Sequence, residues 1–369
     1  MTTNDLVYIG TYSEPIVFGT GQVLQGKGLG IYANRFNRTI GVLEPLHVTE
    51  GVRNSSYIAF DPARRFLFCV NEFKEFEGLA SGSVSAFSID SVTGKLTYLN
   101  SKASHGTDPC HLIVDATGRF VLVANFASGS ICVLPIGKDG LLGDAIQVIQ
   151  HAGSSLDARR QAGPHAHAVE IDNANRFVFV PDLGLDRVMI YAFDEKTGIL
   201  NLNTHQPWIS MVPGAGPRQL VMSPDGAFAY LINELNSTIT AYRYDASKGI
   251  LHDLQTLPTL PPNYSEHSTC AEVQITPDGR FLFGSNRGHD SLAIYAIDCV
   301  TGLMTHIGHQ STLGKIPRNF EISPCGKYLA VANQDSNNVV MFALDPATGK
   351  LTPTGNVVAA GTPICVRFM

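Results

Sequence analysis

The sequence contains few charged residues for its length. Only 16% of its 369 residues are Asp, Glu, Lys or Arg, whereas about 25% is usual in globular domains. The net charge is −6, which argues against a surface that binds nucleic-acid phosphates. An apolar fraction of 44% argues equally against intrinsic disorder. We therefore expect a well-buried fold with no nucleic-acid partner.

Signals for membrane insertion, export and covalent cross-linking are absent. No apolar run reaches the roughly 18 residues of a membrane span, and the first residues lack a basic segment followed by a long apolar run. The seven cysteines include no Cys-x-x-Cys pair, so we expect reduced, mostly buried thiols rather than disulfides or a zinc site. These absences predict a cytoplasmic protein that does not associate with membranes.

One pattern recurs along the chain at intervals of 47 to 57 residues. It consists of a short apolar segment, a turn such as Pro-Asp-Gly, an aromatic anchor and a second apolar segment. Turn formers between alternating apolar runs predict a β-hairpin in each copy. The six anchors are Phe66, Phe120, Phe177, Phe228, Phe281 and Tyr328.

Two further strands are predicted after each hairpin. Seven third strands, such as SVSAFSID at 83–90, are each followed by a fourth strand of Gly-x-Leu type, including DGLLGDA at 139–145. The hairpin that is missing from the seventh set is supplied by both ends of the chain, with its first strand in 361–369 and its second in 6–13.

This arrangement predicts an all-β fold with a single domain over residues 1–369. The fold is a seven-bladed β-propeller with four antiparallel strands per blade, and a blade split between the N- and C-termini closes the ring. Two stacked β-sandwiches are the alternative, but they do not explain the complementary half-repeats at the two ends. The single tryptophan shows that no Trp recurs in each blade, as it does in WD-type propellers.

Hairpin topology predicts which residues meet around the central channel. The first strand of each blade begins, and the second ends, on the same face of the ring. Five residues after each anchor stands an Asn or Asp, which we expect to hold backbone groups in most blades. The next position varies from blade to blade, as a specific site would require: Glu72, Phe126, Leu183, Glu234, Arg287 and Gln334.

The first-strand starts bring more ionisable residues to this face. They are His111, His165, His167, Arg218, Glu272 and Arg318, and His289 lies in a neighbouring loop. Arginine binds carboxylate or phosphate in a bidentate manner, and His or Glu transfers protons near neutral pH. The histidines could instead bind loop backbone, and Arg218 could pair with Glu234. The long loops 13–28 and 73–82 are expected to cover part of the face.

A zinc site formed by His165 and His167 is the metal-dependent alternative. The His-x-His pattern is weak evidence, because no third ligand stands at a telling spacing. We therefore predict no metal and no cofactor.

Several segments resemble one known family. They are HGTDPCHLIVDATGRFVLVANF at 105–126, GPHAHAVEID at 163–172, GPRQL at 216–220, INEL at 232–235, SNRGHDS at 285–291 and ANQDS at 332–336. Together they resemble the seven-bladed β-propeller lactonases, which include bacterial 6-phosphogluconolactonases and fungal carboxy-cis,cis-muconate cyclases. The motifs are typical of the family but do not distinguish one substrate within it.

The resemblance implies a catalytic set on residues that the topology also selects. In the cyclase branch the site is a His, two Arg and a Glu, which fall here on His167, Arg218, Glu234 and Arg287. The sequence has Gln219 where the family usually has His, which leaves the role of that position open. The substrate-binding set predicted beside them is His165, Glu272, His289, Arg318, Asn333 and Gln334.

The resemblance implies hydrolysis of a small anionic lactone of a sugar acid, 6-phosphogluconolactone in the first place, without a metal. Glu234 or His167 would activate water, Arg218 would stabilise the oxyanion, and Arg287 with Arg318 would bind the phosphate or carboxylate. This activity belongs to carbohydrate metabolism in the pentose phosphate pathway. A muconate-type lactonising or isomerising enzyme and a non-catalytic binding propeller are the alternatives. The protein could be a monomer or a homodimer.

Overall fold

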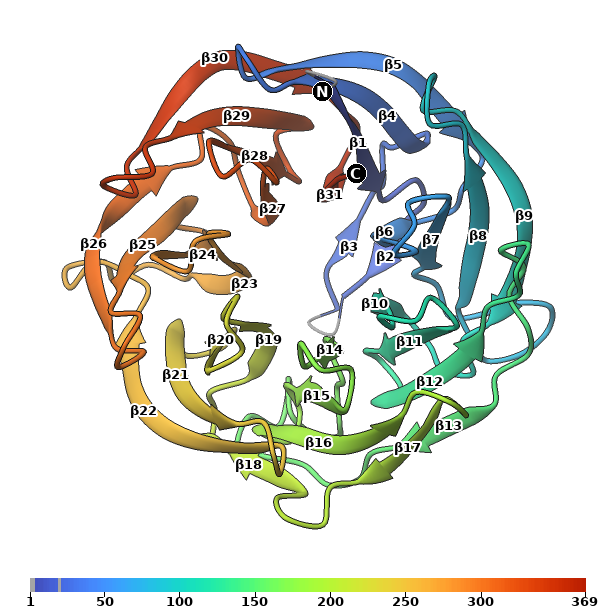
Figure 1. Cartoon of the computed structure of the whole chain (residues 1–369), viewed down its shortest axis with the longest axis horizontal. Helices are drawn as coiled ribbons and strands as arrows, with labels where there is room; N and C mark the ends of the chain where they lie inside the picture. The colour runs from blue at the N-terminus through green and yellow to red at the C-terminus, as the bar shows by residue number, and fades with distance from the viewer. Residues whose placement is uncertain (1–3, 19–20) are drawn as a thin grey trace.

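The computed structural model describes residues 4–18 and 21–369, which form a ring of seven antiparallel sheets around a central channel (Figure 1). Each sheet is a blade whose first strand lies beside the channel and whose fourth lies at the rim. The all-β seven-bladed propeller predicted from the repeats is therefore confirmed. No helix that could span a bilayer occurs in the described part of the chain.

Each blade is named here by its strands from the channel outward. The first four blades are β6 (Ser55–Phe60), β7 (Phe66–Asn71), β8 (Ser83–Ile89), β9 (Leu96–Ala103); β10 (Pro109–Val114), β11 (Phe120–Asn125), β12 (Ser130–Pro135), β13 (Gln147–Gln150); β14 (Glu170–Ile171), β15 (Phe177–Asp182), β16 (Arg187–Asp194), β17 (Ile199–Leu202); and β19 (Pro217–Met222), β20 (Phe228–Asn233), β21 (Thr238–Asp245), β22 (Ile250–Pro258). The other three are β23 (Thr269–Ile275), β24 (Phe281–Arg287), β25 (Ser291–Ile297), β26 (Met304–Ser311); β27 (Pro317–Ile322), β28 (Tyr328–Asn333), β29 (Asn338–Leu344), β30 (Leu351–Ala359); and β31 (Pro363–Phe368), β1 (Asn4–Thr11), β4 (Gly30–Asn37), β5 (Val42–Glu50). Outside this pattern, β18 (Trp208–Ser210) pairs with β16, and β2 (Ile16–Val17) pairs with β3 (Val23–Leu24).

A polar side chain before each anchor fixes the inner hairpin. In the first blade, Oδ1 of Asp61 accepts hydrogen bonds from the backbone N–H groups of Arg65 and Phe66, at 2.6 and 2.7 Å. Ser223 makes the equivalent contact to the N–H of Phe228 at 2.9 Å. A side chain that bonds nearby backbone in this way stabilises the turn. The repeated register of the hairpins thus has a local cause in the sequence.

The split blade closes the ring as predicted. β31 pairs antiparallel with β1, so that Val7 lies opposite Phe368 and Ile9 opposite Val366. The ring of Phe368 packs edge-to-face on Phe36, with centroids 5.1 Å apart, within a core shared with the neighbouring blade of β27–β30. This pairing gives the first and last strands of the chain a partner and leaves no open edge at the seam.

Packing between blades explains the scarcity of charge. Every residue of β7 and β11 is buried, because both faces of these strands meet neighbouring blades. Five of the seven cysteines are buried and all seven are free thiols, as expected: Cys69, Cys110, Cys132, Cys270 and Cys365 are buried, and Cys299 and Cys325 are exposed.

One predicted strand is wrong. Residues 139–145 form turns instead of a fourth strand, and the strand that pairs with β12 is β13. The cause lies in the glycines of this segment. The N–H of Gly137 bonds the carbonyl of Leu141 at 2.8 Å, and the N–H of Gly143 bonds that of Pro135 at 2.9 Å, which turns the chain before the strand begins.

Replacing Phe368 by alanine should test the seam. Phe368 is 3% exposed, and truncating a buried Phe costs about 3–5 kcal/mol of unfolding free energy. We expect Phe368→Ala to lower the free energy of unfolding in urea by that amount. The control Val300→Ala, at a side chain that is 83% exposed, should stay within about 0.5 kcal/mol of wild type. Equal effects of the two changes would contradict the importance of the seam.

Candidate active site

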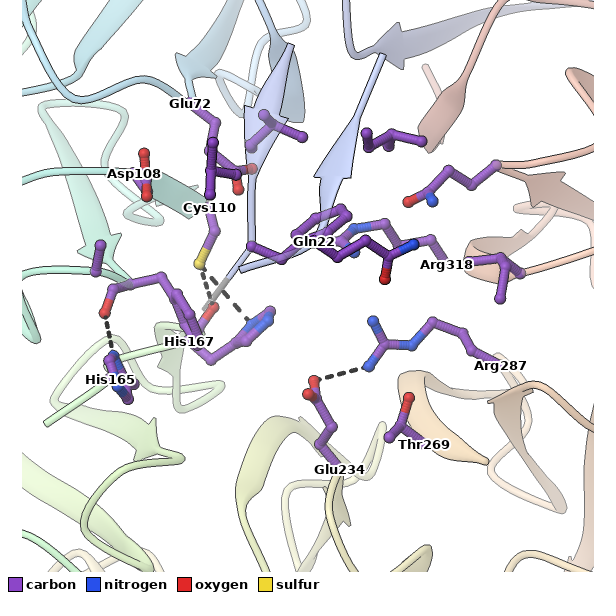
Figure 2. A pocket seen from close by; sticks show the side chains of 18 of the residues that line it. Gln22, Glu72, Asp108, Cys110, His165, His167, Glu234, Thr269, Arg287 and Arg318 are labelled. Carbon is purple, nitrogen blue, oxygen red and sulfur yellow. Dashed lines mark hydrogen bonds and ion pairs between the residues drawn. The ribbon is translucent and has the colours of Figure 1, made fainter. Parts of the chain in front are cut away.

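A cavity of about 490 Å³ opens on the face where first strands begin and second strands end. His167 precedes β14, Glu234 follows β20, and Arg287 ends β24, so these three side chains come from three different blades. Figure 2 shows these side chains pointing toward one another. The predicted site residues that line the cavity are His165, His167, Glu234, Arg287, Arg318 and Gln334.

Two other predicted residues, Arg218 and Glu272, border a narrower space of about 20 Å³. Glu272 accepts hydrogen bonds there from Gln219 at 2.7 Å and Asn319 at 2.6 Å. Because Gln219 and Asn319 come after the strand starts, this space lies further along the channel than the cavity. Glu272 therefore forms hydrogen bonds with residues of the channel wall and does not line the cavity. One of these partners, Gln219, stands where the family usually has His.

The hairpin of β2 and β3 covers part of the cavity. It leaves the split blade and extends toward the centre of the ring (Figure 1). Ile16, Phe18 and Leu24 supply an apolar wall, which matches the predicted role of loop 13–28. The guanidinium group of Arg318 lies over the rings of Tyr12 and Phe18, 5.5 and 5.4 Å from their centroids. The hairpin thus places apolar side chains over the cavity, and one of them, Phe18, packs against the guanidinium group of Arg318.

Glu234 is the centre of an ion-pair network. Its Oε1 accepts from Arg160 at 2.6 Å, and its Oε2 accepts from Arg287 at 2.8 Å and from Arg218 at 3.1 Å. The residue is 4% exposed. Burial raises the pKa of Glu234, but the attraction of Arg287, Arg160 and Arg218 outweighs this effect and holds it well below 4.5. Glu234 is therefore ionised at neutral pH and is a weak base.

Arg218 is held by the same network. Besides Glu234, it donates from Nη1 to the carbonyl of Ala271. Its Nε and Nη1 thus bind protein groups, and the side chain positions Glu234. This arrangement matches the salt-bridge alternative for Arg218 considered above.

The two histidines of the His-x-His motif differ in environment. Burial, and then the charge of Arg218, hold the pKa of His167 well below 6.5, so its imidazole is neutral. The Sγ of Cys110 lies 3.9 Å from Nδ1 of His167. His165 bonds the carbonyl of Phe126 through Nδ1 at 2.9 Å and stacks on the Phe126 ring. His165 therefore binds loop backbone, which is the alternative role that the sequence left open for the histidines.

Three polar groups of the cavity wall have no hydrogen-bond partner among residues 4–18 and 21–369. The Nε of Arg287 and the Oε1 of Gln334 are buried without a hydrogen-bond partner in the described chain. Within the same residues, Arg318 contacts aromatic rings but forms no hydrogen bond or ion pair. Buried polar groups normally have partners, and a bound polar ligand supplies them at a site of this kind.

The structure does not bring Asn333 or His289 to the cavity. Asn333 donates to the carbonyl of Thr312 at 3.1 Å, as Asn125 and Asn286 donate to Ser104 and Thr259 in their blades, so it belongs to the structural series. His289 bonds Ser291 at 2.6 Å, outside the residues that line the cavity. Neither residue lines the cavity, and a role of either in substrate binding stays a prediction.

The predicted catalytic and substrate-binding sets left out several lining residues. The repeat placed Glu72 on this face, because it follows Asn71 as Glu234 follows Asn233, but the sequence assigned it no role. Lys74 and Asp108 form an ion pair of 2.5 Å at the rim. The signal for Arg160 was absent, because this residue comes from the irregular segment 151–169. No group of three or more His, Cys, Asp or Glu side chains that could hold a metal is present in residues 4–18 and 21–369.

Comparison with known proteins places this geometry in a family. The family model described as lactonase, 7-bladed beta-propeller, matches residues 6–368. The chain belongs to the seven-bladed β-propeller lactonases. It is therefore an enzyme of the lactone hydrolase class, as the motifs implied.

Individual relatives agree with this assignment. A 6-phosphogluconolactonase of Bacillus subtilis is 30% identical over 86% of this chain and 85% of its own. A structure from Bacteroides fragilis is 36% identical with a TM-score of 0.90, covering 100% of this chain and 98% of that one. The periplasmic gluconolactonase PpgL of Pseudomonas aeruginosa is 32% identical with a TM-score of 0.90 over 99% of both chains.

The charge on Glu234 should be essential to stability. Glu234→Gln leaves three buried or part-buried guanidinium groups facing a neutral amide, and breaking a buried pair costs about 3–5 kcal/mol. We expect that loss in urea unfolding at pH 7. The control Asp144→Asn, in an exposed pair with Lys102, should cause no measurable change.

The stability lost in Glu234→Gln should also depend on pH. The pKa of Glu234 is lowered on folding, so its stabilisation is present above its ordinary value of 4.5 and is lost as the pH falls toward the folded value. The difference between wild type and Glu234→Gln should therefore shrink on acidification. A difference that does not depend on pH would contradict the ionised network.

Proposed function

We propose that this enzyme hydrolyses the lactone of an anionic sugar acid, with 6-phosphogluconolactone as the substrate, by general acid–base catalysis without a metal. The observation that carries the proposal is the cavity wall with Arg318 and the Nε of Arg287, cationic groups that form no hydrogen bond or ion pair with residues 4–18 and 21–369. The names of the relatives from Bacillus subtilis and Formosa agariphila support the phosphorylated substrate.

The arrangement suits the two parts of such a substrate. Guanidinium groups bind phosphate or carboxylate oxygens strongly, and Arg318 donates no hydrogen bond to the part of the chain that the structure describes. Hydrolysis of a lactone builds negative charge on the carbonyl oxygen, which a fixed donor such as Nε of Arg287 stabilises in the transition state. Arg218 binds Glu234 and the carbonyl of Ala271, and Arg287 binds Glu234 and the carbonyl of Cys270 through Nη2. Because the Nε of Arg287 has no acceptor in the described chain, we assign the oxyanion to this Nε and a positioning role to Arg218.

The amide of Gln334 fits the neutral part of the sugar. Its Nε2 donates to Asp335 at 2.9 Å, which orients the amide, while the buried Oε1 lacks a donor in the described chain. A sugar hydroxyl would supply that donor. The cavity would then bind the anion at Arg318, the carbonyl at Arg287 and a hydroxyl at Gln334.

The substrate can be tested with Arg318→Met. Removing a charge-assisted hydrogen bond costs about 1.5–3 kcal/mol, or roughly ten- to a hundredfold in kcat/KM. We expect that loss for 6-phosphogluconolactone and a smaller one for the uncharged gluconolactone, measured above spontaneous hydrolysis. Lys102→Met, in the outer strand β9, should match wild type on both lactones.

A cis,cis-muconate is assayed in parallel, so that its turnover can be compared with the turnover of the two lactones. Turnover of the muconate without turnover of either lactone would contradict the proposal and favour the lactonising alternative. Equal losses on both lactones in Arg318→Met would contradict the anion-binding role of Arg318.

A further inference from the structure

A second carboxyl group, Glu72, faces the cavity from the side opposite Glu234. The two residues follow the second strands β7 and β20, so they hold equivalent positions in two blades. Figure 2 shows them entering the cavity from opposite sides. Glu72 is 5% exposed and borders both the cavity and the narrower space. Two buried carboxyl groups thus flank the space where a substrate would bind.

The surroundings of these two carboxyl groups differ in kind. Glu234 binds three guanidinium groups, whereas Glu72 forms no ion pair within the described residues and instead accepts from the hydroxyl of Tyr12 at 3.0 Å. Burial raises the pKa of Glu72 to about 7, with Arg318 opposing this rise and Asp108 adding to it. Carboxyl groups with opposed environments divide between ionised and proton-carrying roles in enzymes.

Two titratable neighbours of Glu72, Cys110 and Tyr12, keep their protons at neutral pH. Burial holds the pKa of the Cys110 thiol and of the Tyr12 phenol well above their ordinary values, so both are neutral. Asp108 pairs with Lys74. Arg318 is a permanent cation. His111 and His167 border the same narrower space, and burial holds the pKa of both well below 6.5. Glu72 is the group beside them whose pKa is raised to about 7.

We propose that Glu72 is the general base, and then the general acid, of the lactone hydrolysis assigned above. The inference rests on that proposed function. The carboxylate of Glu72 takes a proton from water as the water oxygen bonds to the lactone carbonyl carbon, whose π electrons move onto the oxyanion beside Arg287. The ring C–O bond then breaks, and Glu72 returns the proton to the departing alkoxide oxygen. The products are the open hydroxy acid, which ionises in solvent, and the regenerated carboxylate.

Glu72→Gln tests the assignment directly. General-base catalysis contributes about 10²–10⁴, so kcat/KM should fall a hundredfold or more, while the product sugar acid should bind with unchanged Kd. Glu75→Gln is the matched control, because Glu75 is exposed in the following loop and lies outside the cavity lining. Wild-type kcat/KM in Glu72→Gln would overturn the proposal. Loss of product binding along with the rate would also overturn it, since that result assigns Glu72 to substrate holding.

Tyr12→Phe supplies a readout that a structural role would not affect. The hydrogen bond from Tyr12 lowers the pKa of Glu72, so its removal should raise that pKa. A base acts in its ionised form, and kcat/KM should rise with pH through the pKa of Glu72. The acidic limb of the pH profile should therefore move to higher pH in Tyr12→Phe. An unmoved limb would overturn the proposal, also in the case that Glu72→Gln does not fold.

The wild-type assay separates this inference from the proposed function. If wild type does not hydrolyse the lactones above the spontaneous rate, the proposed function fails and the role of Glu72 fails with it. If wild type is active and Glu72→Gln is equally active, the role of Glu72 fails and the lactonase function stands.

Discussion

The antiparallel pairing of β31 with β1 is the contact on which the ring depends. Each blade buries both of its faces against neighbours, so an opening at any seam would expose two apolar faces at once. Joining the two ends of the chain in one blade prevents such an opening. The closed ring also fixes the seven first strands around one channel, and the cavity residues are held at the ends of these rigid strands.

The channel imposes an electrostatic condition on the site. Charges that leave water lose their hydration, and they are tolerated only when they are paired or when a ligand pairs them. Glu234 satisfies three arginines at once and is thereby fixed in its ionised form. Glu72 and Arg318 are not balanced in this way. Glu234 and its arginines thus form a fixed part of the cavity wall, whereas Glu72 and Arg318 remain available to a substrate.

The sequence predicted most of the fold because the fold repeats. Asp61, Ser223 and their equivalents mark each hairpin, and the half-repeats at both ends revealed the closure. Hairpin topology then selected the face on which the cavity opens. Prediction from the repeat failed where the chain departs from it. Turns at the glycines near 139–145 shift the fourth strand of one blade, and Arg160 reaches Glu234 from an irregular segment.

Positions could be predicted, but the use of each side chain could not. Asn333 and Gln334 are adjacent, yet the first bonds the backbone of Thr312 and the second lines the cavity, because successive residues at a strand end point in different directions. Likewise Glu72 and Glu234 are equivalent in the repeat. Only their partners, a tyrosine hydroxyl and three arginines, distinguish a proton carrier from a fixed anion.

The most direct measurement of the central claim is a crystal structure with 6-phosphogluconate, the product of the proposed reaction. The account predicts the ligand in the cavity beneath the β2–β3 hairpin, with its phosphate on Arg318 and its carboxylate beside Arg287, between Glu72 and Glu234. A ligand bound elsewhere on the ring, or a phosphate that does not contact Arg318, would contradict it.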